Sequence, residues 1–169
     1  MNITVFKNKI LTLSNWQVIQ CDNSYNYIHS KIFEFASEQR QINLIDCGSR
    51  FNPYILAKAA RYSRINIEKM LSCINISRMF TVYQLKSQLE IEKNSCINPI
   101  IISDIDRIID DDSISENEME KVLDICILKI LEIKSPVLIG TRKRDSDNYQ
   151  IFTSLNKNSD LKLPGGFYG

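Results

Sequence analysis

The 169-residue sequence has no long apolar run, a single histidine and only five glycines. Because no stretch of about 18 apolar residues occurs, the sequence predicts no membrane span. The first residues, MNITVFKNKILTLSNW, are interrupted by Asn, Lys and Thr, unlike the apolar core of a signal peptide, so we expect a cytoplasmic protein.

Closely spaced cysteine pairs are also missing, and His29 is the only histidine available to a zinc site. Structural zinc sites need such pairs, so we expect no bound metal. The five cysteines mostly end apolar runs, which favours buried, reduced thiols over metal ligands; they are Cys21, Cys47, Cys73, Cys96 and Cys126.

Charge is unevenly distributed although the net charge is only +1. Residues 104–120 carry eight acids and one base, a local charge of −7, whereas residues 134–169 carry six bases and three acids, a local charge of +3. A polyanion should therefore prefer the C-terminal part of the chain.

Apolar runs and amphipathic segments alternate along the chain, and its length suits one domain. Strands are expected at 16–21, 42–47, 73–77, 99–105 and 136–141, and helices at 24–39, 52–63, 81–94 and 115–134. Strands separated by helices predict an α/β fold, with a mostly parallel central sheet and helices on both faces.

Ligands of such sheets bind at the carboxyl ends of the strands, where Asp46 and Asp104 stand. A carboxylate at this position either holds a magnesium ion through water or caps the turn that follows the strand. The sequence leaves both interpretations open for each residue.

The turn between the strand at 16–21 and the next helix lacks the glycines of a phosphate-binding loop. When the chain is aligned with that pattern, Asn23 and Ile28 stand at the two glycines, His29 at the lysine and Ser30 at the hydroxyl residue. Of these positions, only Ser30 has the residue type of the pattern. Tyr25 and Tyr27 would crowd a triphosphate, although Tyr27 and Ile28 also suit the core side of a helix. His29 is a candidate general base, but a lone histidine here is more often a surface or capping residue.

Residues 42–90, from INLIDC to KSQLE, resemble the core of the RecA/RadA-type recombinase superfamily, particularly its archaeal and eukaryotic branch. The matching residues are a strand-end acid, a Phe and Pro that open a helix, and an Arg-x-Phe followed by a glutamine; they are Asp46, Phe51, Pro53, Arg78, Phe80 and Gln84. PIIISDI resembles the Walker B strand, with Asp104 as its acid. PVLIGT resembles the strand that ends in a polar sensor residue, which is Thr141 here. LPGG (163–166) resembles the segment that follows the second DNA-binding loop. The resemblance covers about residues 15–166 and implies a RecA-like ATPase core. It also implies that the N-terminal DNA-binding domain and the last strands of that core are absent.

The chain departs from the family at both catalytic positions. Gly48 stands where the family has the glutamate that activates water, and His29 replaces the lysine. Loss of either group would be expected to lower the rate by orders of magnitude. The resemblance therefore implies an inactive pseudo-ATPase without ATP or magnesium, whose vestigial nucleotide site comprises Asn23, Ile28, His29, Ser30, Gly48, Asp104 and Thr141.

The second DNA-binding loop of the family corresponds to residues 142–162. Three bases that suit a phosphate backbone and two aromatic residues that suit base stacking occur there; they are Arg142, Lys143, Arg144, Tyr149 and Phe152. The alternative is a solvated loop beside a packed YQIF strand. The first such loop corresponds to the acidic segment after Asp104, which repels phosphates.

These features together favour a non-catalytic recombinase paralog, an accessory protein of homologous recombination or DNA repair. It would bind a recombinase or another paralog, and single-stranded DNA, in a small homo- or hetero-oligomer. Two alternatives stay open. One is a protein-interaction subunit that binds no DNA and uses the acidic segment as its contact surface; the other is a residual ATPase whose site a neighbour completes.

Overall fold

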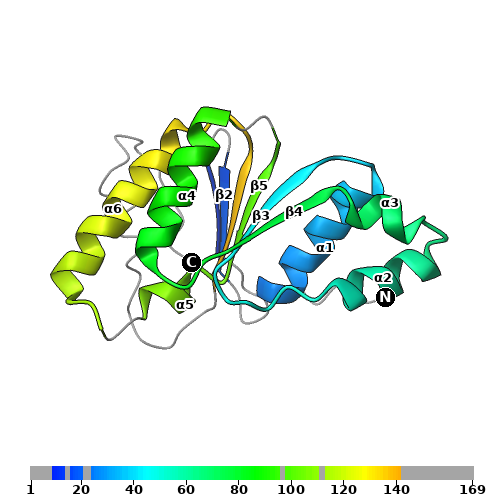
Figure 1. Ribbon diagram of the computed structural model, residues 1–169, viewed down its shortest axis with the longest axis horizontal. Coiled ribbons are helices and arrows are strands. Elements are labelled where there is room, and N and C mark those ends of the chain that lie inside the picture. The colour runs from blue at the N-terminus through cyan, green and yellow to red at the C-terminus, as the bar shows by residue number, and fades with distance from the viewer. Residues whose placement is uncertain (1–8, 14–15, 21–23, 96–97, 111–112, 142–169) are drawn as a thin grey trace.

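A computed structural model describes residues 9–13, 16–20, 24–95, 98–110 and 113–141 of the chain (Figure 1). The strands in these ranges are β1 (Lys9–Leu13), β2 (Trp16–Gln20), β3 (Ile42–Asp46), β4 (Ile74–Arg78), β5 (Ile100–Ser103) and β6 (Val137–Thr141). The helices are α1 (Ser24–Ser37), α2 (Pro53–Tyr62), α3 (Ile67–Leu71), α4 (Val82–Ser95), α5 (Asp106–Ile109) and α6 (Glu116–Glu132).

The described strands form one sheet in the order β1-β2-β6-β5-β3-β4. Strand β1 pairs antiparallel with β2, and every other neighbouring pair is parallel. The register aligns Gln20 with Thr141, and Asp46 with both Ser103 and Arg78. The carboxyl ends of the five parallel strands therefore meet at one edge of the sheet.

Helices cover both faces of the sheet (Figure 1), as predicted. The connections from β2 to β3 and from β3 to β4 advance in one direction across the sheet, whereas those from β4 to β5 and from β5 to β6 return. Right-handed crossovers that reverse direction must change face. Accordingly α1, α2 and α3 lie on one face, and α4 and α6 lie on the other.

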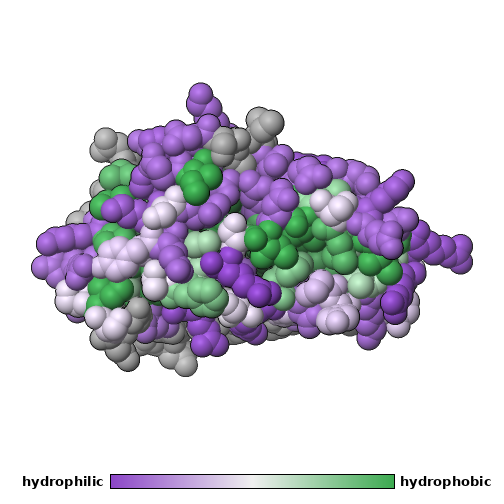
Figure 2. Space-filling model, in the orientation of Figure 1, coloured by the Kyte–Doolittle hydropathy of each residue, from purple (hydrophilic) through white to green (hydrophobic). Residues whose placement is uncertain are grey.

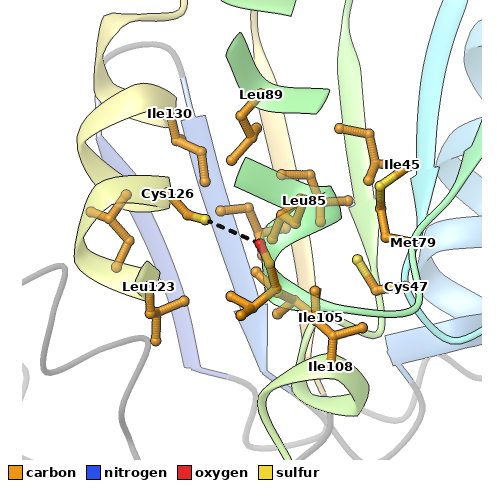
Figure 3. Packing of buried hydrophobic residues seen from close by; sticks show 14 of the residues in the cluster. Ile45, Cys47, Met79, Leu85, Leu89, Ile105, Ile108, Leu123, Cys126 and Ile130 are labelled. Atoms are coloured by element: carbon orange, nitrogen blue, oxygen red, sulfur yellow. Dashed lines mark hydrogen bonds between the residues drawn. The ribbon is translucent and has the colours of Figure 1, made fainter. Parts of the chain in front are cut away.

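Strand residues alternate between two hydrophobic cores because successive side chains of a strand point to opposite faces. Leu44, Ile101 and Leu138 belong to the core under α1, α2 and α3. Their chain neighbours Ile45 and Ile102 belong to the core under α4 and α6, shown in Figure 3. Full burial of each such side chain contributes about 1.5–3 kcal/mol, which explains why β5 and β6 are continuous apolar runs.

Local sequence accounts for several helix boundaries. Asn52 accepts a hydrogen bond from the Tyr54 amide at the start of α2, and Pro53 occupies the first turn, where its missing N–H is not needed. Ser115 caps α6 by accepting from the Glu118 amide, and the glutamates of the first turn suit the helix dipole.

A glycine in β6 lets α1 approach the sheet closely. A Cβ at Gly140 would lie 2.8 Å from Cγ1 of Ile28, below normal van der Waals contact. Ile28 is only 2% exposed, so the position aligned with a phosphate-loop glycine is a core residue.

Three elements were not predicted from the sequence: the antiparallel strand β1 and the short helices α3 and α5. The prediction of buried, reduced thiols is confirmed for Cys47, Cys73 and Cys126, which are free and buried. The other two cysteines lie outside the described residues. No helix in the described part of the chain is long and apolar enough to cross a membrane.

Candidate functional site

The neighbouring strands β3 and β5 form the topological switch point of the sheet. The chain leaves β3 toward α2 on one face, whereas it leaves β5 toward α5 and α6 on the other. Open α/β sheets bind ligands in the crevice that this divergence creates outside the carboxyl ends of the strands. The residues that follow β3 and β5 therefore define the candidate site.

Asp46, the last residue of β3, holds the following loop in place. Its side chain is fully buried. Oδ2 accepts the Phe51 amide at 3.0 Å, and Oδ1 accepts the Arg50 amide at 3.3 Å and the Ser103 hydroxyl at 3.2 Å. Of the two roles that the sequence left open for Asp46, the structure shows the turn-capping role.

Gly48 lies directly against Asp104 across the switch point. A Cβ at Gly48 would lie 2.8 Å from Cβ and 2.9 Å from Oδ2 of Asp104. Two neighbouring backbones have positive φ, at 51° for Ser49 and 50° for Asp104, a region that costs non-glycine residues free energy. The position of the family's glutamate therefore has no room for a side chain in this arrangement.

The buried carboxylate of Asp104 forms an ion pair with Arg50. Nη1 of Arg50 lies 3.5 Å from Oδ1, and the Asp104 side chain is 1% exposed whereas that of Arg50 is 41% exposed. The acid that the resemblance assigns to magnesium is thus engaged by a cation of the chain itself.

Four residues at this edge stack into a continuous cluster, which we call the aromatic plug: Tyr25, His29, Arg50 and Phe51. The Arg50 guanidinium lies 4.6 Å from the centre of the Tyr25 ring. The Tyr25 and His29 rings are 4.0 Å apart, and the His29 and Phe51 rings are stacked at 5.7 Å. The aromatic plug joins the start of α1 to the loop after β3.

Both ring nitrogens of His29 have backbone partners. Nδ1 lies 2.9 Å from the Tyr25 carbonyl oxygen and so carries the donated proton, and Nε2 lies 3.3 Å from the Asn52 amide and so accepts. This arrangement requires the neutral imidazole. Burial lowers the pKa of His29, against the smaller raising effects of the Tyr25 carbonyl and of Asp46 and Asp104. His29 is 5% exposed, so of the two structural interpretations of this histidine, a surface or a capping residue, the surface one is wrong.

Acidification should weaken the fold through His29. Because its pKa is lower in the folded protein than the ordinary value of 6.5, the unfolded chain binds the proton more readily. The contribution of His29 to stability is therefore complete above about pH 6.5 and is lost as pH falls through the folded pKa, with a slope of at most about 1.4 kcal/mol per pH unit. Urea unfolding between about pH 5 and 7.5 measures this slope.

His29→Gln provides the control for that pH dependence, since glutamine retains a donor and an acceptor but does not titrate. We expect the variant to have a shallower slope than the wild type. Equal slopes for the two proteins would show that other groups carry the pH dependence.

The remaining residues that the resemblance assigns to a nucleotide site lie outside the aromatic plug. Thr141, at the end of β6, is buried and donates through Oγ1 to Oδ1 of Asp106 at 3.3 Å. Ser30 is exposed on α1, and Ile28 packs in the core. Tyr27 packs against the same core as Ile28, so of the two tyrosines expected to crowd the site only Tyr25 contributes to the aromatic plug.

Several predicted residues lie outside the described part of the chain. These are Asn23, the DNA-binding candidates Arg142, Lys143, Arg144, Tyr149 and Phe152, and the LPGG segment. Within the described ranges, no group of three or more His, Cys, Asp or Glu side chains is arranged to hold a metal ion.

Arg50 and Ser103 are site residues that the sequence did not indicate. Arg50 is a charged residue in a predicted loop, and its partner Asp104 is 54 positions away. The sequence shows only that Arg50 follows the strand-end acid Asp46 by four residues, and this position does not indicate Asp104 as its partner. Ser103 precedes the predicted acid Asp104, and its link to Asp46 depends on the pairing of β3 with β5.

Comparison of the chain with known proteins finds no relative. No family model matches the chain, and no curated protein matches it. The geometry described above therefore carries the functional argument.

Proposed function

We propose that the chain is a non-catalytic, RecA-fold recombinase paralog that acts by binding in homologous recombination or DNA repair. The observation that supports this proposal is the aromatic plug, in which side chains of the chain itself pack together between the start of α1 and the loop after β3. The positions that the resemblance assigns to the acid, the glutamate and the sensor, which are Asp104, Gly48 and Thr141, are all near this carboxyl edge.

The chemistry of the edge argues against turnover. A nucleotide site needs a carboxylate that is open to magnesium or water. Here Arg50 pairs with Asp104, and Asp46 accepts the amides of Arg50 and Phe51. Cys47, the nearest thiol, is no substitute nucleophile, because burial and then the charge of Asp46 raise its pKa.

The edge strand β4 suits the binding of a protein partner. Among the described strands it pairs with β3 alone. Ile76 in β4 is 42% exposed and Phe80 just after it is 65% exposed. Figure 2 shows apolar surface in the region where β4 crosses the view of Figure 1. An exposed edge strand with apolar neighbours accepts an extended segment as a further strand, and we assign that segment to a recombinase or another paralog.

Affinity capture from the native cell tests this partner. The wild-type chain should recover a recombinase or paralog, and Ile76→Lys with Phe80→Lys should reduce recovery at least about tenfold, because charge on an edge strand opposes pairing. The matched control is Ile125→Lys with Leu128→Lys, which changes two exposed apolar residues of α6. Capture that recovers no recombination protein, or that is equal for both variants, would contradict the proposal.

The proposal includes single-stranded DNA as a second ligand, held through residues 142–144. Binding that weakens with salt, and that is lost when Arg142, Lys143 and Arg144 become alanine, is the expected result. Calorimetry with magnesium and ATP should detect no binding; measurable affinity would favour the residual ATPase with a composite site instead.

A further inference from the structure

Helix α2 turns a stripe of aromatic and basic side chains toward solvent. Leu56 and Ala60 form its buried side, at 1% and 0% exposure. The opposite side follows the helical spacing i, i+4, i+7 and i+8. Its residues, which we call the α2 stripe, are Tyr54, Lys58, Arg61 and Tyr62.

The two tyrosines of the α2 stripe are the most exposed of the large hydrophobic side chains described. Tyr54 is 82% exposed and Tyr62 is 80% exposed. Helix α2 lies at the outside of the molecule, at the lower right of Figure 1. Both rings therefore offer open faces to a ligand. An aromatic face binds any nucleobase by stacking, with about 1–3 kcal/mol for each base.

Positive charge surrounds these rings. Residues 53–72 contain four bases, Lys58, Arg61, Arg64 and Lys69, and one acid, Glu68, so this segment carries +3 while the whole chain carries +1. Within the described part of the chain, none of the four bases forms an ion pair. Their charges are therefore available to phosphate groups, in contrast to Arg50, which pairs with a carboxylate.

From this arrangement we propose that the α2 stripe binds single-stranded DNA. Tyr54 and Tyr62 are about 12 Å apart along the helix, so the two rings contact different bases of one strand. The rings stack on bases while Lys58 and Arg61, which lie between them, contact the connecting phosphates. A duplex presents no open base faces to the rings, so the ligand is a single strand.

A membrane surface fits the α2 stripe less well than DNA. Helices that lie in a bilayer interface bury a broad side of Trp, Phe and Leu in the acyl region. In α2 the corresponding side, with Leu56 and Ala60, packs on the protein core. The choice of DNA over RNA rests on the proposed function, whereas the choice of a single-stranded nucleic acid rests on the α2 stripe itself.

Fluorescence anisotropy of a labelled oligo(dT) of about 20 nucleotides, titrated with the full chain at several salt concentrations, tests the proposal. Lys58→Ala with Arg61→Ala should lower affinity about tenfold and reduce the salt slope by about 1.4, at about 0.7 for each phosphate contact on a single strand. Tyr54→Ala with Tyr62→Ala should lower affinity at least about tenfold without changing the salt slope, and Tyr54→Phe with Tyr62→Phe should retain binding because the rings remain.

Arg107→Ala with Lys121→Ala is the charge-matched control, since both residues are exposed on the side of α5 and α6. This variant should bind as the wild type does. Equal weakening in the control and in the α2 variants would overturn the proposal, as would unchanged affinity in the α2 variants. Equal binding of oligo(rU) would overturn the assignment to DNA, and binding to anionic vesicles in place of oligonucleotide would overturn it in favour of a membrane.

The two DNA-binding proposals fail separately. If alanine at Arg142, Lys143 and Arg144 abolishes binding while the α2 variants do not change it, the inference on α2 is wrong and the proposed function stands. If only the α2 variants lose affinity, the inference on α2 stands and the assignment of DNA binding to residues 142–144 is wrong.

Discussion

Replacing Gly48 with glutamate, the residue that the resemblance calls for at this position, is expected to lower the free energy of unfolding by about 2–3 kcal/mol and to produce no ATP hydrolysis. A Cβ at Gly48 would lie 2.8 Å from Cβ of Asp104, so the new side chain must displace the end of β5. Its carboxylate would also lie beside that of Asp104, and like charges at this separation repel. Chemical denaturation and phosphate release with magnesium and ATP measure the two effects.

Gly48→Ala separates the two causes, since alanine adds the Cβ without the charge. We expect a cost of about 1 kcal/mol, at the low end of overpacking costs, and a larger cost for glutamate. A Gly48→Glu protein that is as stable as the wild type and hydrolyses ATP would contradict both expectations.

The residues that stand at the family's catalytic positions are connected in the structure. The resemblance implies a carboxylate at position 48 and a metal beside Asp104. Here Gly48 allows the two turns to approach, and Arg50 supplies the positive charge beside Asp104. The aromatic plug then extends this ion pair to α1 through Tyr25. Restoring one residue therefore does not restore the geometry around it.

Much of the fold was predictable from local sequence, because burial on both faces of a parallel sheet requires continuous apolar runs. The apolar runs IIIS and VLIG predict β5 and β6. Ser115 indicates the start of α6, and Pro53 indicates the start of α2. Strand β1 was missed because KILTL has no strong pattern of its own and depends on pairing with β2.

The candidate site was less predictable than the fold, since its contacts join distant parts of the chain. Asp46 and Asp104 were identified from their places after strands, but Arg50 pairs with Asp104 only because β3 and β5 are neighbours in the sheet. His29 was identified as the residue at the lysine position. Its hydrogen bond from the Asn52 amide joins residues 23 positions apart, so local sequence does not reveal it.

Asp46→Ala is expected to destabilise the protein by about 3–5 kcal/mol, because it leaves one buried and two partly buried donors without their acceptor, at up to about 1–3 kcal/mol each. The amides of Arg50 and Phe51 and the Ser103 hydroxyl all donate to this fully buried carboxylate. Chemical denaturation measures the loss. Hydrogen exchange gives a second measurement, because the Arg50 and Phe51 amides should exchange faster than the core of β5 once their acceptor is gone.

Ser103→Ala is the matched control for Asp46→Ala, since it removes one of the same hydrogen bonds and leaves the carboxylate in place. Its expected cost is about 1 kcal/mol, and the Arg50 and Phe51 amides should stay protected. If Asp46→Ala costs no more than Ser103→Ala, the loop after β3 does not depend on Asp46. In that case its order comes from the ion pair of Arg50 with Asp104 and from the stacking of Phe51 on His29. If the larger cost is found, Asp46 positions two members of the aromatic plug, and the strand-end acid has a structural role at the candidate site.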